Sequence, residues 1–141
     1  MAFIQESDKA VIKERLSDMR SEVTLRYFTQ DIECEFCRET HELLQELSAL
    51  DDKIKLEVFD FTKNADEASK YKIDKIPATV VMNSNDFGIR FYGIPAGYEF
   101  SSFLEAIIMV SQGESSLSQE SKSFLKEVKS PVHLQVFVTP T

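Results

Sequence analysis

The sequence predicts an α/β fold in which helices flank a central mixed sheet, and three observations support this prediction. Between residues 23 and 71, strand-like and helical segments alternate in the pattern of a βαβ unit, whose two strands run parallel. Two further strand-like segments, joined by a short polar turn, indicate an antiparallel hairpin. The chain has 141 residues, of which 43% are apolar, so it can bury one full core, and we expect one main domain.

The first half of the chain supplies the predicted βαβ unit. Asp8–Arg20 carries one apolar stripe at helical spacing, which predicts an amphipathic helix. Val23–Thr29 is β-branched and aromatic, as is typical of a strand. Leucines between residues 43 and 50 recur at helical spacing, so we expect a helix that begins at or near Cys34. Ile54–Phe59 alternates apolar and polar residues and predicts the second strand.

The second half supplies the hairpin and a closing helix. Asn64–Tyr71 is rich in Ala, Glu and Lys and predicts a short helix. Ala78–Met82 and Ile89–Tyr92 are typical of strands, and the turn residues Asn83–Asp86 between them favour a hairpin. Apolar residues between Phe100 and Met109 form a wide stripe, which indicates a helix packed on the sheet.

Composition and charge exclude several classes of partner. The net charge is −8, with 24 acidic against 16 basic residues, which argues against binding to nucleic acid or to an anionic membrane. No apolar run reaches the length that spans a bilayer, and the first eight residues lack the basic and apolar segments of a leader peptide. We therefore expect a cytoplasmic protein.

The only two cysteines, Cys34 and Cys37, lie where the first strand meets the start of a helix. Unpaired N–H groups and the positive end of the helix dipole favour thiolate there, and thiolate is the reactive form. In a reducing cytosol such a pair is more often catalytic or metal-binding than structural. An inert reduced pair and a zinc half-site are the alternatives, although only His41 and His133 could add imidazole ligands. We interpret His41, one turn beyond Cys37, as a solvated helix residue and not as a ligand or a base.

The last part of the chain repeats its beginning. Residues 130–137 match residues 21–28 at four positions, with an offset of 109 residues, and a period of about one domain indicates duplication. The sequence therefore predicts a first domain over residues 1–113 that holds the cysteine pair. Residues 114–141 would form the opening helix and strand of a truncated second unit.

Four segments carry a resemblance to a known family: CEFC at 34–37, VFDF at 58–61, YKIDKIPAT at 71–79 and DFGIRFYGIPAGYEF at 86–100. With the order of elements over residues 8–112, they are similar to the thioredoxin fold. More narrowly, the chain resembles the N-terminal half of the glutaredoxin-like protein disulfide oxidoreductases, which carry two tandem thioredoxin-type units. The resemblance implies a thioredoxin-like fold for both units, with a Cys-x-x-Cys site in the first.

The resemblance also implies roles for five residues. Cys34, nearer the helix start, would attack a substrate disulfide, and Cys37 would resolve the mixed disulfide. No metal, flavin or nucleotide would be needed at this site. Pro77 would be cis and lie against the cysteine pair, and the backbone of Ile76 would pair with an extended substrate segment. Phe36 could add an apolar contact to the substrate.

The surroundings of the cysteines predict a moderate Cys34 pKa. Asp31, Glu33 and Glu35 place negative charge near Cys34 and oppose the helix dipole, whereas Arg38 offers one positive charge. Phe28 stands six residues before Cys34, where thioredoxins often place a buried Asp that aids proton transfer. How this chain moves its protons is therefore open.

The leading hypothesis is thiol–disulfide exchange on protein disulfides, with a reductase or other thiol donor as a second partner. Two alternatives stay open: a non-enzymatic thioredoxin-fold binding unit, and an electron-relay domain of a flavoprotein disulfide reductase. An unpaired apolar strand over Val132–Val138 would also expose an edge that invites pairing, so we expect self-association or disorder there.

Overall fold

The structure is a computed structural model that describes residues 2–139. Its elements in chain order are α1 (Glu6–Leu16), β1 (Val23–Thr29), α2 (Cys37–Ser48), β2 (Ile54–Asp60), α3 (Ala65–Lys70), β3 (Ala78–Met82), β4 (Ile89–Tyr92), α4 (Glu99–Gln112) and α5 (Gln119–Glu127). The predicted α/β class is confirmed, and the elements form a thioredoxin-like fold.

The four strands form one mixed sheet in the order β2-β1-β3-β4. β1 and β2 are parallel, as the βαβ pattern predicted, and the β3–β4 pair is the predicted antiparallel hairpin. β1 also pairs with β3 in the antiparallel sense, and Phe28 near the end of β1 lies opposite Ala78 at the start of β3. The loop that leaves β1 and the segment that enters β3 therefore lie at the same end of the sheet.

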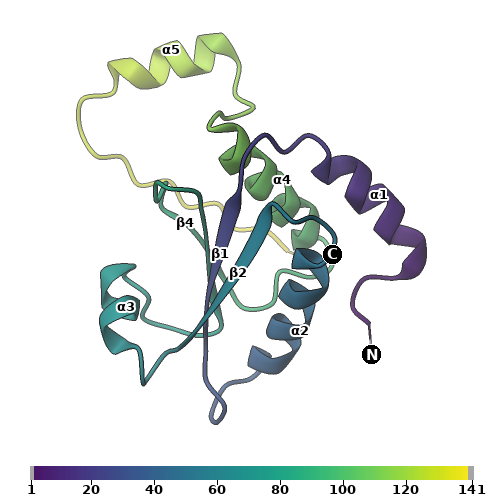
Figure 1. Cartoon of the computed structure of the whole chain (residues 1–141). Helices are drawn as coiled ribbons and strands as arrows, with labels where there is room; N and C mark the ends of the chain where they lie inside the picture. Colours follow the sequence, from purple (N-terminus) through teal and green to yellow (C-terminus); the bar gives the residue numbers. More distant parts are fainter. Residues whose placement is uncertain (1, 140–141) are drawn as a thin grey trace.

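Helices cover both faces of the sheet (Figure 1). Along β1 the side chains alternate in direction. Val23, Leu25 and Tyr27 are buried in the larger core cluster, which also takes buried residues from α1, α2 and α4. Phe28 belongs to a smaller cluster on the other face, together with Ala68 of α3 and residues from β3. β1 is thus the central strand around which both cores are built.

Two helix ends differ from the prediction. The first helix ends at Leu16 instead of Arg20, although Met19 stays buried beyond it. The helix at the cysteines begins at Cys37, and Phe36 before it has a left-handed backbone with φ of 65°. Because a left-handed residue cannot continue an α-helix, Cys34 lies in the turn before α2 and outside the helix itself.

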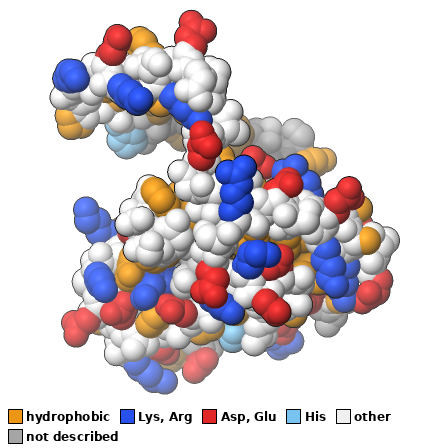
Figure 2. Space-filling view, turned by 45° about the horizontal axis from the view of Figure 1, so that its top comes forward, with side chains coloured by type: hydrophobic (Ala, Val, Ile, Leu, Met, Phe, Trp, Pro, Cys, Tyr) orange, Lys and Arg blue, Asp and Glu red, His pale blue; other side chains and the backbone are white. Residues whose placement is uncertain are grey.

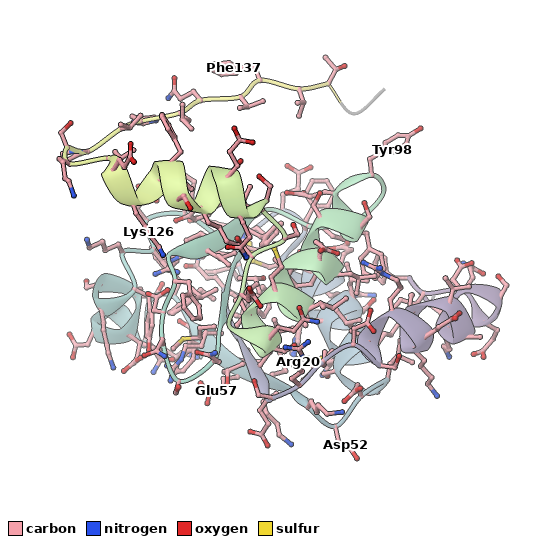
Figure 3. All side chains as sticks on the ribbon, turned by 90° about the horizontal axis from the view of Figure 1, so that it is seen from above. Arg20, Asp52, Glu57, Tyr98, Lys126 and Phe137 are labelled. Carbon is pink, nitrogen blue, oxygen red and sulfur yellow. A yellow bond between two sulfur atoms is a disulfide. The ribbon has the colours of Figure 1, made fainter. Side chains whose placement is uncertain are left out.

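The strand expected over Val132–Val138 is not formed, and residues 128–139 lie outside every helix and strand. A strand needs a neighbouring strand to satisfy its backbone groups, and this segment has none on which to pair. α5 stands apart from the body (Figure 2), and in the view of Figure 3 the segment after it runs beyond α5, away from the sheet, where Phe137 lies. Exposed apolar side chains along this part of the chain are Phe124, Leu125, Val128, Val132, Leu134, Val136, Phe137 and Val138.

Among the described residues, no helix combines the length and the apolar character that crossing a membrane requires.

An ion pair closes the β3–β4 hairpin. The two terminal nitrogens of Arg90 donate to the two oxygens of Asp86 at 2.9 and 2.6 Å, and the Gly88 N–H donates to the same carboxylate at 2.9 Å. The hydrogen bonds from Arg90 hold the pKa of Asp86 at about 2, below its ordinary value of 3.8. Arg90 also donates to the Tyr71 carbonyl at 3.1 Å, so the pair ties the hairpin to the end of α3.

We predict that Asp86→Asn lowers the free energy of unfolding at neutral pH by roughly 1 kcal/mol, about half of what the pKa shift alone implies, because the pair is partly exposed and screened. Since the folded pKa lies below the unfolded one, this contribution is present above about pH 4 and is lost as the pH falls toward about 2. Urea unfolding of both proteins across this range measures it.

Asp74→Asn is the matched control, because Asp74 forms an exposed ion pair with its neighbour Lys75 and should contribute little. A difference between wild type and Asp86→Asn that persists unchanged down to about pH 2 would contradict the assignment to this ion pair.

Candidate redox site

The two cysteines form a disulfide at the junction of β1 and α2. Cys34 and Cys37 are bonded through sulfur, and their Cα atoms are 5.6 Å apart. Cys37 is the first residue of α2 and is only 3% exposed, whereas Cys34 lies in the preceding turn and is half-buried. The predicted pairing of the two thiols is confirmed, and the two sulfurs differ in how easily a second molecule can reach them.

The turn between the cysteines has an unusual backbone. Phe36 is left-handed, which is rare for a bulky residue and costs about 1–2 kcal/mol. Its carbonyl accepts from both the N–H and the hydroxyl of the buried Thr40, at 2.9 and 2.6 Å. In this conformation Phe36, which lies between the two cysteines in the sequence, is 49% exposed.

A buried tyrosine on β1 is hydrogen-bonded to the start of α2. Tyr27 on β1 is fully buried, and its hydroxyl donates a hydrogen bond to the carbonyl of Cys37. Burial raises the Tyr27 pKa, and the side chains of Thr29 and Thr40 partly oppose this shift. Sequence reasoning missed Tyr27, although it is the one polar-tipped side chain among the inward positions 23, 25 and 27 of the strand.

An open hollow of about 480 Å³ lies beside the disulfide. The side chains that line it come from the end of β1, the loop after it, α2 and β2: Thr29, Gln30, Asp31, Cys34, Cys37, Arg38, His41, Val58 and Asp60. His41 was expected to be solvated. The structure places it half-buried on the wall of this hollow, with its ring centroid 5.7 Å from that of Tyr27.

The charges around Cys34 are more one-sided than the sequence suggested. Asp31, Glu33 and Glu35 are exposed in the turn, as expected. Arg38, which was expected to compensate them, donates to Glu42 at 3.0 Å. Part of its positive charge is therefore already balanced within α2. This arrangement stabilises the Cys34 thiolate less than an unpaired arginine would.

Pro77 lies at the same end of the sheet as the cysteine turn. The Ile76–Pro77 peptide bond is cis, as the resemblance implied. Pro77 is buried directly before Ala78, which pairs with Phe28 on β1, and its carbonyl accepts from the Gly93 N–H at 2.9 Å. Ile76 is half-buried and packs against the smaller core cluster, and among the described residues neither its N–H nor its C=O has a partner.

Phe28 occupies the position where thioredoxins often have a buried Asp. Its ring stacks on that of Phe59, with the ring centroids 5.3 Å apart, and the centroid of the Tyr71 ring lies 6.5 Å away. This position is therefore part of an apolar cluster. Within residues 2–139, no group of three or more His, Cys, Asp or Glu side chains is arranged to hold a metal ion.

No protein-family model matches the chain, and no curated protein matches it. Solved structures do. A protein disulfide oxidoreductase from Aeropyrum pernix is 27% identical, with a TM-score of 0.78 over 89% of this chain and 56% of its own length. The alkylhydroperoxide reductase AhpF from Enterococcus faecalis is 28% identical, with a TM-score of 0.79 over 90% of this chain and 62% of its own. The NTD_N/C domain of AhpF, also 28% identical, gives a TM-score of 0.76 over 84% of this chain and 58% of its own.

The fold, the disulfide and these likenesses define a thioredoxin-fold unit with a redox site of the thiol–disulfide oxidoreductase type. The unit is similar to one part of each of these three proteins, which agrees with the resemblance found in the sequence. The chain spans between 56% and 62% of the length of the three neighbours.

Proposed function

We propose that this protein exchanges thiols with the disulfides of other proteins, with Cys34 as the nucleophile and Cys37 as the resolving cysteine. The difference in exposure between the two cysteine residues carries this assignment, because a substrate can approach the half-buried Cys34 more easily than Cys37, which is 3% exposed. Cys37 is three residues from Cys34 and within bonding distance of it, so it is suited to the second, intramolecular step.

In the reducing direction, the Cys34 thiolate attacks one sulfur of a substrate disulfide, and the other substrate sulfur leaves as a thiolate. Cys37, as thiolate, then attacks the Cys34 sulfur, which restores the observed disulfide and releases the second substrate thiolate. An external thiol donor or a reductase must supply two electrons to start the next cycle. The same steps in reverse oxidise a substrate.

Three features support contact with an extended protein segment at Ile76, Pro77 and Phe36. The backbone N–H and C=O of Ile76 have no partner among the described residues, so an incoming strand can pair with them. Pro77 lies at the sheet end from which the cysteine turn leaves. The exposed ring of Phe36 supplies apolar area between the two cysteines. Main-chain pairing tolerates many side chains, which favours a broad range of protein substrates.

A second candidate is a thiol relay within a larger reductase. The likeness to AhpF and to its NTD_N/C domain favours it. In that role the Cys34–Cys37 pair would pass electrons between two sites of one assembly, and free protein disulfides would be poor substrates. A purely binding role has no observation of its own in its favour. A cytoplasmic location, expected from the composition, stays a prediction.

We predict that Cys34→Ser abolishes the reduction of insulin disulfides by dithiothreitol-charged protein, because no accessible thiolate remains. Cys37→Ser should still perform the first step and then stop, so a mixed disulfide with the substrate should accumulate. Non-reducing electrophoresis and intact mass spectrometry measure both results. Insulin reduction that survives in Cys34→Ser, or trapping through Cys37 in that variant, would overturn the proposed roles.

We also propose that residues 114–141 begin a second thioredoxin-like unit after the domain at residues 1–113. The internal repeat supports this, and so does the exposed apolar surface that α5 and the following segment present. The neighbours match 84% to 90% of this chain, which is more than its first 113 residues. A strand sequence without a partner strand favours pairing with a second copy of the chain.

We expect this chain to associate as its concentration rises, because residues 130–138 can pair between copies. Deleting residues 130–141 should leave a monomer at every concentration, which light scattering after size exclusion measures. If both chains elute with the same mass over a hundredfold range of concentration, the association does not use this segment.

A further inference from the structure

The buried resolving cysteine needs a group that removes its proton. Cys37 must be a thiolate to attack the Cys34 sulfur, yet it is 3% exposed, and burial away from water disfavours the charged form of a thiol. Phe28 and its aromatic neighbours offer no base on the α3 side of β1. The proton therefore has to leave through the hollow, onto a group that lines it.

The ionisable groups that line this hollow, apart from the cysteines, are Asp31 from the loop, Asp60 from β2, and Arg38 and His41 from α2. Tyr27 of β1 lies behind the hollow and packs against the His41 ring. Tyr27 has a raised pKa and donates its hydrogen to the Cys37 carbonyl, so it acts as a donor. Arg38 is permanently protonated. Neither can accept the proton.

The two carboxylates are poorly suited to the task. Asp60 accepts from the N–H groups of Thr62 and Lys63 at 3.0 and 2.8 Å, and its second oxygen lies 3.8 Å from the Lys63 ammonium. Asp31 lies exposed in the loop. A carboxylate is in general a weaker base than an imidazole, and the best proton acceptor near neutral pH is the group whose pKa lies near that pH.

His41 is positioned for proton transfer by three observations. It stands four residues after Cys37 on α2, a spacing that brings Cβ atoms within about 5–6 Å of each other on one helix face. It lines the same hollow as both cysteines. Neither of its ring nitrogens has a hydrogen-bond partner within the described part of the chain, while its ring packs against Tyr27.

We propose that His41 is the acid–base group of the resolving step, an inference that rests on the proposed function. Its neutral imidazole takes the proton of the Cys37 thiol, directly or through one water in the hollow. The Cys37 sulfur then forms its bond to the Cys34 sulfur, and the bond from Cys34 to the substrate sulfur breaks. The substrate sulfur leaves with the electron pair and receives the proton from the imidazolium, so His41 returns to its neutral form.

This role makes the resolving step depend on pH in the range where imidazole changes charge. An imidazolium cannot accept a proton, so resolution should slow in acid and level off where the imidazole is neutral. Without His41 the rate should follow hydroxide concentration instead and rise continuously with pH, because only solvent then removes the proton.

The test is a single-turnover measurement of resolution in full-length protein. A mixed disulfide between Cys34 and thionitrobenzoate is formed in acid, and the release of the coloured thiolate is followed after jumps to different pH values. In His41→Gln we expect release at neutral pH to slow by about tenfold, the low end for general acid–base catalysis because the hollow is open to water. The plateau in the pH profile should also disappear.

His133→Gln is the matched control, because it removes the other histidine from an exposed segment far along the chain and should leave the profile unchanged. Added imidazole should restore release in His41→Ala but not change wild type. Unfolding curves of the oxidised variants show whether α2 is intact. A wild-type profile retained in His41→Gln overturns this inference while leaving the proposed function standing. No Cys34-dependent exchange in wild type overturns the proposed function itself.

Discussion

The hydrogen bond from the buried Tyr27 hydroxyl to the Cys37 carbonyl joins the central strand of the sheet to the first turn of the helix that carries the site. β1 is paired on both sides and packed on both faces, so it is among the best-fixed parts of the molecule. Anchoring Cys37 to this strand fixes the less exposed sulfur. The more exposed sulfur of Cys34 stays in a turn, where a partner can reach it.

Two local features then set the chemistry of this turn. The left-handed Phe36 starts α2 at Cys37 and holds an aromatic ring in solvent, which is a strained arrangement that packing must maintain. Exposed acids surround Cys34, and Arg38 is shared with Glu42. The thiolate is therefore favoured by the nearby helix start and disfavoured by charge, a combination that suits reversible exchange better than a fixed oxidised or reduced state.

Much of the fold was predictable because its strands carry strong local signals. Val23–Thr29 is rich in β-branched and aromatic residues and is bounded by polar segments, so its expected limits match β1. The start of α2 was not predictable, since the left-handed Phe36 depends on contacts made from within the helix that follows it. The roles of Tyr27 and His41 depend on how α2 is rotated over β1, which no local pattern encodes. Val132–Val138 has a strand-like sequence but forms no strand in the structure, because pairing needs a partner strand outside the segment itself.

The central claim is that Cys34 and Cys37 cycle together between dithiol and disulfide. The most direct test equilibrates the protein in glutathione or dithiothreitol buffers of graded redox potential. The free thiols are then trapped with an alkylating agent, and the masses of the products are measured by mass spectrometry. The account predicts one reversible transition in which both thiols appear together, with a tenfold change in the ratio of reduced to oxidised protein for every ~30 mV. Thiols that are alkylated one at a time, or a pair that stays unchanged across the whole range, would contradict it.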